Sequence, residues 1–309
     1  MSFALDVKKE LAKAENKSRS QDFAEVYGML LFSRHFSSSE IGLKTKSISV
    51  AELCISKLNT LFAPVVEKQS VLKPTKNFIN LHTVSLVIPE ECDRIFTSFG
   101  HSEKSPSLRL NRANIEDDMC RVAFLRGAFL SCGSVNDPAK NYHLEFCSQY
   151  KNLSQDLCTL LCEIEECSLS PKIILRSGAY VVYLKDSEQI TDLLTYMGAP
   201  GSAMDIMNAK AYKEMRNLAN LRTNSEFANI TKTANASARQ LWAIEKLDRS
   251  IGLSSLPEPL YEIALLRREN PELSLRALGD LLSPPISRSG VNHRLQKLIE
   301  LAENEVKGE

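Results

Sequence analysis

The sequence has no excess of either charge, no long apolar run and no paired-cysteine motif, and each absence excludes a class of protein. Its 309 residues carry 38 Lys and Arg against 38 Asp and Glu, which excludes a histone-like protein with a basic surface throughout. No stretch approaches the roughly 18–20 uninterrupted apolar residues of a membrane span, and residues 1–10 lack the basic-then-apolar order of a signal peptide. We therefore expect a cytoplasmic protein with no membrane contact.

Cysteine occurs eight times but never as Cys-x-x-Cys, and no histidine stands at zinc-finger spacing from any of the eight. Cys158 and Cys162 would share a helix face, which leaves a metal site open, but reduced thiols among apolar neighbours are the simpler interpretation. With 43% hydrophobic and 25% charged residues, the composition excludes disordered chains, collagen-like chains and disulfide-dense toxins. We expect no metal and no cofactor.

An internal repeat organises the first two-thirds of the chain. Helices are predicted over residues 21–33 and 117–131, and each is followed by a strand, a helix and two strands. Placing residues 24–36 on residues 123–135, an offset of about 99, aligns Ala24 with Ala123 and Gly28 with Gly127. This predicts an α+β fold in which two α-β-α-β-β units, residues 1–107 and 108–207, pack about a pseudo-two-fold axis.

Basic residues in the first unit do not form one clear surface. Residues 42–50 are predicted to form a strand, and Lys44 and Lys46 would then share a face with Ile48 and Val50. The first unit has some basic character, but this pattern does not demonstrate a continuous DNA-binding saddle.

Glycine stands at equivalent positions inside both repeated helices. A glycine inside a helix costs about 1 kcal/mol relative to alanine, so two at matched positions need a reason. With an alanine four residues before each glycine, the small residues form one stripe on each helix. This stripe predicts that the two helices pack closely along Ala24, Gly28, Ala123 and Gly127. The alternative is that the glycines only bend their helices.

The paired helices resemble, in degenerate form, the LAGLIDADG motifs of homing endonucleases. In that family an acidic residue at the second-last motif position binds the catalytic divalent cation, and that position falls on Ser33 and Cys132. Neither is a carboxylate, so the resemblance implies a fold whose catalysis has been lost. Asp137 and Glu40 lie nearby in sequence, but turn or surface roles explain them more simply. An active magnesium-dependent endonuclease remains the alternative.

A longer run narrows this resemblance. The segment from Ala123 to Pro138, followed by residues 142–145, is similar to the bacterial WhiA family of sporulation and cell-division regulators. The similarity covers essentially the whole chain. It implies a DNA-binding regulator that carries an inactive nuclease-like domain.

Residues 208–249 are expected to form a basic helical connector. They contain eight basic and four acidic residues, interleaved with asparagines and with few large apolar residues. Such a composition suits contacts to phosphates and base edges better than core formation, and it makes Lys232 and Arg239 predicted DNA contacts. A solvated linker helix is the alternative.

Residues 250–309 have the pattern of an all-α helix-turn-helix domain. Ser274 is expected to cap a short helix over residues 275–282, and prolines 284 and 285 to form the turn. The next helix places Val291, Leu295, Leu298, Ile299 and Ala302 on one face, while residues 286–297 contain no acid. Its polar face supplies the predicted DNA contacts Ser287, Arg288, Ser289, Asn292, His293, Arg294, Gln296 and Lys297. A three-helix bundle with a solvated face is the alternative.

The segment from Ser287 to Leu295 agrees with the WhiA resemblance. Together these features predict a non-enzymatic, nucleoid-associated regulator of cell division, chromosome segregation or sporulation-type genes. Its expected partner is double-stranded DNA. A further hypothesis is an interaction protein whose repeat domain binds another transcription regulator or a sigma factor.

Overall fold

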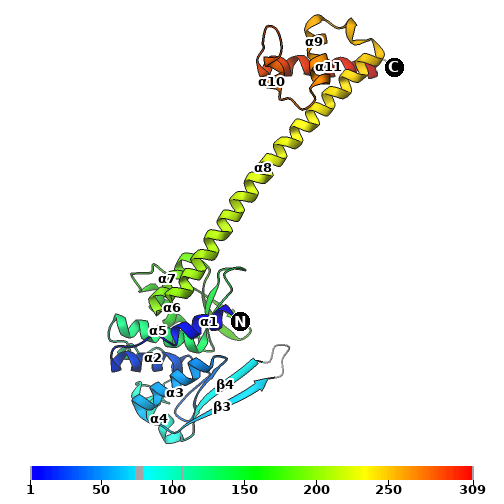
Figure 1. Cartoon of the computed structure of the whole chain (residues 1–309). Helices are drawn as coiled ribbons and strands as arrows, with labels where there is room; N and C mark the ends of the chain where they lie inside the picture. Colours follow the sequence, from blue (N-terminus) through cyan, green and yellow to red (C-terminus); the bar gives the residue numbers. More distant parts are fainter. Residues whose placement is uncertain (1, 74–78, 106, 308–309) are drawn as a thin grey trace. The chain divides into compact units, whose positions relative to one another are not determined.

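Two copies of one helix-and-strand motif occupy the first part of the chain (Figure 1). The computed structural model describes residues 2–73, 79–105 and 107–307. It divides into two compact units, residues 1–213 and 214–309, which we call unit 1 and unit 2. In unit 1 a helix α1 (Phe3–Leu11) precedes the first copy. That copy consists of α2 (Arg19–Leu31), β1 (His35–Phe36), β2 (Ile41–Thr45), α3 (Ile48–Phe62), β3 (Val66–Lys73), β4 (Ile79–Leu86) and α4 (Pro89–Ser98).

The second copy repeats this order after a short 3-10 turn, η1 (Arg112–Asn114). It consists of α5 (Asp118–Cys132), β5 (Gly133–Val135), β6 (Leu144–Ser148), α6 (Lys151–Cys162), β7 (Lys172–Arg176), β8 (Ala179–Leu184) and α7 (Ser187–Met197). The antiparallel sheets have matching strand orders, β1-β2-β4-β3 and β5-β6-β8-β7. The predicted α+β fold with a pseudo-two-fold pair of units is therefore confirmed.

The predicted α-β-α-β-β order was incomplete because it lacked β1 and β5. These strands have two and three residues and follow their helices almost directly, so they are too short to show an alternating pattern. Both copies bury their apolar residues in one continuous core, which explains why neither is a separate compact unit.

The strand predicted over residues 42–50 was wrong in its second half. β2 ends at Thr45, and α3 begins at Ile48. Val50 belongs to the buried stripe of α3 rather than to a strand face, because apolar residues continue from it at helical spacing. Lys44 and Lys46 are both exposed, so the reason against a continuous basic surface here no longer applies.

Helices α2 and α5 pack with their backbones in contact. A Cβ atom added to Gly28 would lie 2.2 Å from the Phe124 carbonyl oxygen, and one added to Gly127 would lie 2.0 Å from the Glu25 carbonyl oxygen. The offset of about 99 residues relates Gly28 to Gly127 and Glu25 to Phe124, so each contact is the symmetry mate of the other. The structure thus places both glycines at the crossing of the pair, where only the absence of a side chain permits this approach.

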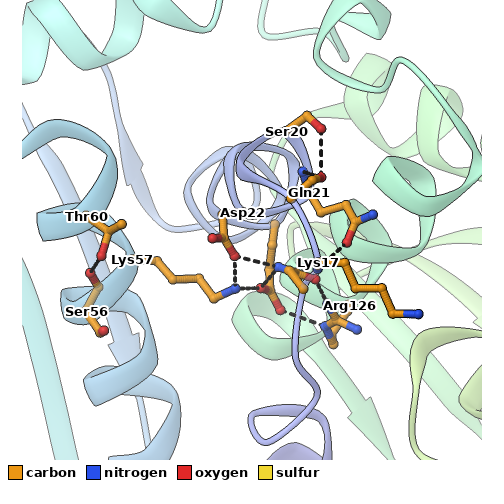
Figure 2. Close-up of polar contacts among 11 residues, drawn as sticks. Lys17, Ser20, Gln21, Asp22, Ser56, Lys57, Thr60 and Arg126 are labelled. Carbon is orange, nitrogen blue, oxygen red and sulfur yellow. Dashed lines mark hydrogen bonds and ion pairs between the residues drawn. The ribbon is translucent and has the colours of Figure 1, made fainter.

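A buried network of charged groups crosses this helix pair (Figure 2). The Glu25 side chain has no exposed surface, and its carboxylate accepts a hydrogen bond from Arg126 Nε at 2.7 Å. Asn16 Nδ2 donates to the same carboxylate at 2.7 Å, and Lys57 pairs with both Glu25 and Asp22. Two carboxylates and two cations therefore balance in a network that is buried at Glu25 and Arg126 and reaches the surface at Asp22.

Helix α1 joins the ends of two other helices in unit 1. The Glu10 carboxylate accepts hydrogen bonds from the backbone N–H groups of Gly201 at 2.7 Å and Ser202 at 2.8 Å. These residues form the first turn of α8 (Pro200–Ser250), where a negative charge is favourable. Lys8 contacts the opposite kind of helix end, at the C-terminus of α5.

Unit 2 contains the later part of α8 and four shorter elements. They are η2 (Leu253–Ser255), α9 (Glu258–Glu269), α10 (Leu275–Asp280) and α11 (Arg288–Lys307). The predicted connector, residues 208–249, lies wholly within α8, and the boundary between the two units, after residue 213, also falls inside this helix. In the described part of the chain, no helix is both long enough and apolar enough to cross a membrane.

Candidate nucleic-acid interface

Helix α11 is held in unit 2 by one apolar face. The stripe predicted from its sequence, Val291, Leu295, Leu298, Ile299 and Ala302, is buried in a core with residues from α8, α9 and α10. This prediction is confirmed. The opposite face of α11 is therefore presented to solvent.

The turn between α10 and α11 is defined by capping and by one close backbone approach. Ser274 Oγ accepts a hydrogen bond from Ala277 N at the start of α10. Ser287 Oγ accepts one from Gly290 N, at 3.2 Å, at the start of α11. A Cβ atom on Gly279 would lie 2.3 Å from the Ile286 carbonyl oxygen, so the returning chain passes directly against α10. These contacts fix where α11 begins.

Most of the predicted base-reading residues lie on the exposed face of α11. Their side chains emerge from its first three turns, which contain no acid. This face combines donors and acceptors suited to base edges with cations suited to phosphates. The exposed members are Ser287, Arg288, Ser289, Asn292, His293, Gln296 and Lys297.

Arg294 differs from its neighbours. Its side chain is half-buried, and Nη1 donates to the Pro259 carbonyl oxygen at 3.5 Å. The structure therefore places Arg294 against α9, where it helps to hold α11 in position. Its role in DNA contact stays a prediction, because this exposed hydrogen bond uses only one nitrogen of the guanidinium.

The two predicted contacts on α8 are placed in different surroundings. Lys232 is exposed and lines a groove that also reaches Arg288 and Asn292. Arg239 forms an ion pair with Glu303 at 2.5 Å. Glu303 lies 15 residues beyond Arg288 on α11, which is about 22 Å along a helix. Lys232 thus joins the predicted base-reading face, whereas Arg239 does not.

The groove beside α11 has a volume of about 810 Å³ and is open to solvent. Four helices of unit 2 contribute to its lining. Besides Lys232, Arg288 and Asn292, its polar lining residues are Thr233, Gln240, Arg267, Ser274, Arg276, Asp280 and Ser287. Sequence reasoning missed Arg276 and Arg267. An exposed cation two residues after the Ser274 cap could have indicated Arg276, but nothing local marks Arg267.

The degenerate catalytic positions lie at the ends of the paired helices in unit 1. Ser33 is buried, and its hydroxyl donates to the His35 carbonyl oxygen at 3.0 Å. Burial raises the pKa of the Cys132 thiol to about 12, so this group is neutral at physiological pH. Magnesium prefers charged oxygen ligands, and these two residues provide none. The described residues contain no cluster of three or more His, Cys, Asp or Glu that could hold a metal ion.

The two other acids near these helices have local partners. Asp137 Oδ1 accepts a hydrogen bond from Ala139 N at 2.9 Å, which stabilises a turn. Glu40 pairs with the His35 imidazole at 2.9 Å. The residues at this centre therefore do not fit a catalytic magnesium ion.

Lys8 lies at the same end of α5. Its ammonium group donates to the Leu130 carbonyl oxygen at 3.0 Å and lies 5.9 Å from the centre of the Phe129 ring. A cation is favourable at a helix C-terminus, where carbonyl groups remain without intrahelical partners. The Lys8 ammonium group thus places a positive charge at the end of α5, beside the degenerate catalytic position Cys132.

The titration of Lys8 leads to a testable prediction. Burial lowers its pKa from 10.5 to about 8; the nearby Cys132 thiol opposes this shift and Lys46 adds to it. Unfolding therefore takes up a proton between about pH 8 and pH 10.5, and this group's contribution to the free energy of unfolding rises with pH in that window. Lys8→Met removes that rise. The free energy of unfolding of the parent minus that of Lys8→Met should increase by about 1–3 kcal/mol from pH 7 to pH 10.5.

This difference is measured by urea unfolding followed by far-ultraviolet circular dichroism. Lys13→Met, at an exposed lysine just beyond α1, is measured in parallel to subtract the general effect of losing a lysine. A parent-minus-variant difference that stays level over the range would contradict the prediction.

Comparison with family models identifies both parts of the chain. A model of the WhiA LAGLIDADG-like domain matches residues 121–216, and a model of the WhiA C-terminal helix-turn-helix domain matches residues 219–302. The boundary between these matches lies close to the boundary between unit 1 and unit 2.

Curated relatives match over nearly the full length. The chain is 36% identical over 318 residues to a protein of Clostridium botulinum named "Probable cell division protein WhiA", covering 98% of both chains. It is 36% identical over 319 residues to a protein of the same name from Alkaliphilus metalliredigens, covering 99% of this chain and 98% of that one. The crystal structure of full-length WhiA from Thermotoga maritima matches with a TM-score of 0.59 and 25% identity, covering 98% of this chain and 99% of that one.

Proposed function

The chain belongs to the WhiA family, and from this premise we propose that it is a transcriptional regulator of cell-division genes that binds double-stranded DNA through α11. The observation that carries the proposal is the exposed face of the first three turns of α11, which contain no acid and begin at a capped N-terminus. A helix-turn-helix inserts this part of its second helix into the major groove. The names of the relatives support a role in cell division.

The proposal assigns base reading to Arg288 and Asn292 and backbone contact to Ser287, Ser289 and Lys297. Arg pairs bidentately with guanine and Asn with adenine, and both side chains lie in the first turns of α11. His293 and Gln296 are neighbouring exposed groups that we also assign to the interface. Binding through this face would bring the protein to the nucleoid. Chromosome-segregation and sporulation-type genes are further proposed targets.

Substitution of both base-reading residues tests this function. The variant Arg288→Ala, Asn292→Ala should lose about 1–3 kcal/mol per base contact, a reduction of about 5- to 150-fold each, and should lose much less affinity for unrelated duplexes than for its specific sites. The measurement is genome-wide occupancy of the full chain, followed by titration of the occupied sequences. The matched control is Glu300→Ala, Asn304→Ala, which changes two exposed residues at the same spacing farther along α11. Unchanged sequence preference in the first variant would overturn the assignment.

We further propose that unit 1 has no nuclease activity. The support is the donor set at the ends of α2 and α5, where Ser33 and a neutral Cys132 stand at the positions of the metal-binding acids. The purified chain should leave supercoiled DNA intact in the presence of magnesium. The comparison is Asp137→Ala. If the parent chain nicked DNA and this substitution abolished the nicking, unit 1 would have an active centre.

A further inference from the structure

The groove beside α11 contains a buried cation without a matching acid. Arg267 has only 2% of its surface exposed, yet it contributes to the lining of the groove and therefore lies at its base. Its Nε donates to Gln240 Oε1 at 2.8 Å, and its Nη1 donates to the Leu273 carbonyl oxygen at 2.8 Å. No carboxylate among the described residues pairs with it.

Arg267 has only neutral hydrogen-bond partners, and its Nη2 is not among the buried side-chain atoms that are closed off without a partner. Burial lowers the pKa of its guanidinium, which reflects the cost of removing the charge from water. Neutral oxygens accept from Nε and Nη1, but Nη2 makes no hydrogen bond within the described part of the chain. A buried charge without a counter-charge is unfavourable, and an anion in the groove would supply one.

The rim of the groove adds to its positive charge. Lys232, Arg276 and Arg288 reach it from α8, α10 and α11, and all three are exposed. Asp280 is the one acid among the lining residues. The N-terminus of α11, a helix of 20 residues, opens at the same place through Ser287. Three exposed cations and a helix N-terminus thus surround the buried guanidinium.

We propose that this groove seats a backbone phosphate of duplex DNA, with Arg267 at its base and Lys232 and Arg276 at its rim. The inference rests on the proposed function, because it assumes that α11 enters the major groove. DNA rather than a free anion is the expected occupant, since Arg288 and Asn292 belong both to the groove lining and to the base-reading face. A phosphate held there would lie beside the bases that α11 reads and would set the register of the helix. Arg267 is thus a positioning residue.

The salt dependence of DNA binding tests the contributions of Arg276 and Lys232 at the rim of the groove. Arg276→Ala and Lys232→Ala should each weaken binding of the full chain to any duplex by about 3- to 10-fold in 50 mM salt. Each should also reduce the slope of log affinity against log salt by about 0.9, because one phosphate contact is lost. The matched control is Arg249→Ala, at an exposed arginine of unit 2 outside the groove lining, which should leave the slope unchanged.

A conservative substitution tests Arg267, the residue at the base of the groove. Arg267→Lys keeps the charge but removes the fork that carries Nη2, so it should also weaken binding to all duplexes. Fluorescence of Trp242, the single tryptophan of the chain, reports whether unit 2 remains folded in this variant. If Arg267→Lys unfolds unit 2, the rim variants still decide the proposal.

Inorganic phosphate, used alone, distinguishes the two sources of the anion. We expect phosphate to stabilise unit 2 weakly against unfolding, as followed by Trp242 fluorescence. We also expect a smaller slope of log DNA affinity against log salt in both rim variants. Protection by phosphate with unchanged DNA slopes would overturn the proposal in favour of a free-anion site. Unchanged slopes without protection would overturn it outright. In either case, a loss of sequence preference in Arg288→Ala, Asn292→Ala would still support the proposed function. If that variant kept its sequence preference as well, both the proposed function and the phosphate site would be overturned.

Discussion

Replacing Arg126 with methionine is expected to lower the free energy of unfolding of unit 1 by about 3–5 kcal/mol. Arg126 has 4% of its surface exposed and is the hydrogen-bonded partner of the fully buried Glu25 carboxylate. Methionine fills similar volume but leaves the network with two carboxylates, on Glu25 and Asp22, and a single cation on Lys57. The cost is that of an uncompensated charge inside the core rather than of one lost contact.

Denaturant unfolding followed by circular dichroism measures this loss. The matched control is Arg112→Met, because Arg112 forms a two-point ion pair with Glu163 on the surface, with 54% of its side chain exposed. Surface pairs contribute about 0–1 kcal/mol, so the same substitution there should have a small effect. The double variant Glu25→Gln, Arg126→Met should recover part of the loss, since Asp22 and Lys57 then balance. Equal losses at Arg126 and Arg112 would contradict the role given to the buried network.

The double substitution Gly28→Ala, Gly127→Ala should destabilise unit 1 by about 3–6 kcal/mol, because each overpacked contact costs about 3 kcal/mol and the two share one helix crossing, where costs do not simply add. The added Cβ atoms would lie 2.2 Å and 2.0 Å from carbonyl oxygens of the facing helix, and backbone cannot move aside as a flexible side chain does. Helices α2 and α5 would have to separate, which loosens the core that both repeats share. Such a loss is comparable with the whole stability of many domains.

Two signals separate the effect on unit 1 from any effect on unit 2. Far-ultraviolet circular dichroism should show an early transition in the double variant, while the Trp242 fluorescence transition in unit 2 should remain at its parent position. Gly290→Ala is the matched control, because this helical glycine of α11 has its nearest neighbour at an ordinary 3.4 Å. There the substitution should stabilise unit 2 by up to about 1 kcal/mol, since alanine favours helix. If the double variant were as stable as the parent, α2 and α5 would pack less closely than the structure shows.

Local patterns predicted most of the secondary structure. The helix expected over residues 117–131 corresponds to α5, and the cap expected at Ser274 is formed at the start of α10. Both helices have their start signal within a few residues, because Asp117 and Ser274 each accept a hydrogen bond from a backbone N–H of the first turn. The strand over residues 42–50 failed because a short apolar run fits a strand and the start of a helix equally well.

The candidate site was predictable only where its residues share one helix. The exposed face of α11 followed from the stripe opposite it, which had to be buried. Arg239 and Lys232 belong to the same basic segment, and only the fold separates them, because Glu303 pairs with Arg239 across 64 residues. Arg294 likewise follows the base-reading face in sequence but contacts α9.

By itself, the sequence determined the repeat, its glycine-marked helix pair, the helix-turn-helix and the absence of acids at Ser33 and Cys132. These features are properties of residue type and spacing, which local periodicity and an internal offset reveal. The tertiary structure alone decided that Lys8 lies at the end of α5 and that Arg267 lies beneath the groove without an acidic partner. Each depends on contacts between segments far apart in the chain, and burial and charge compensation arise only when those segments pack together.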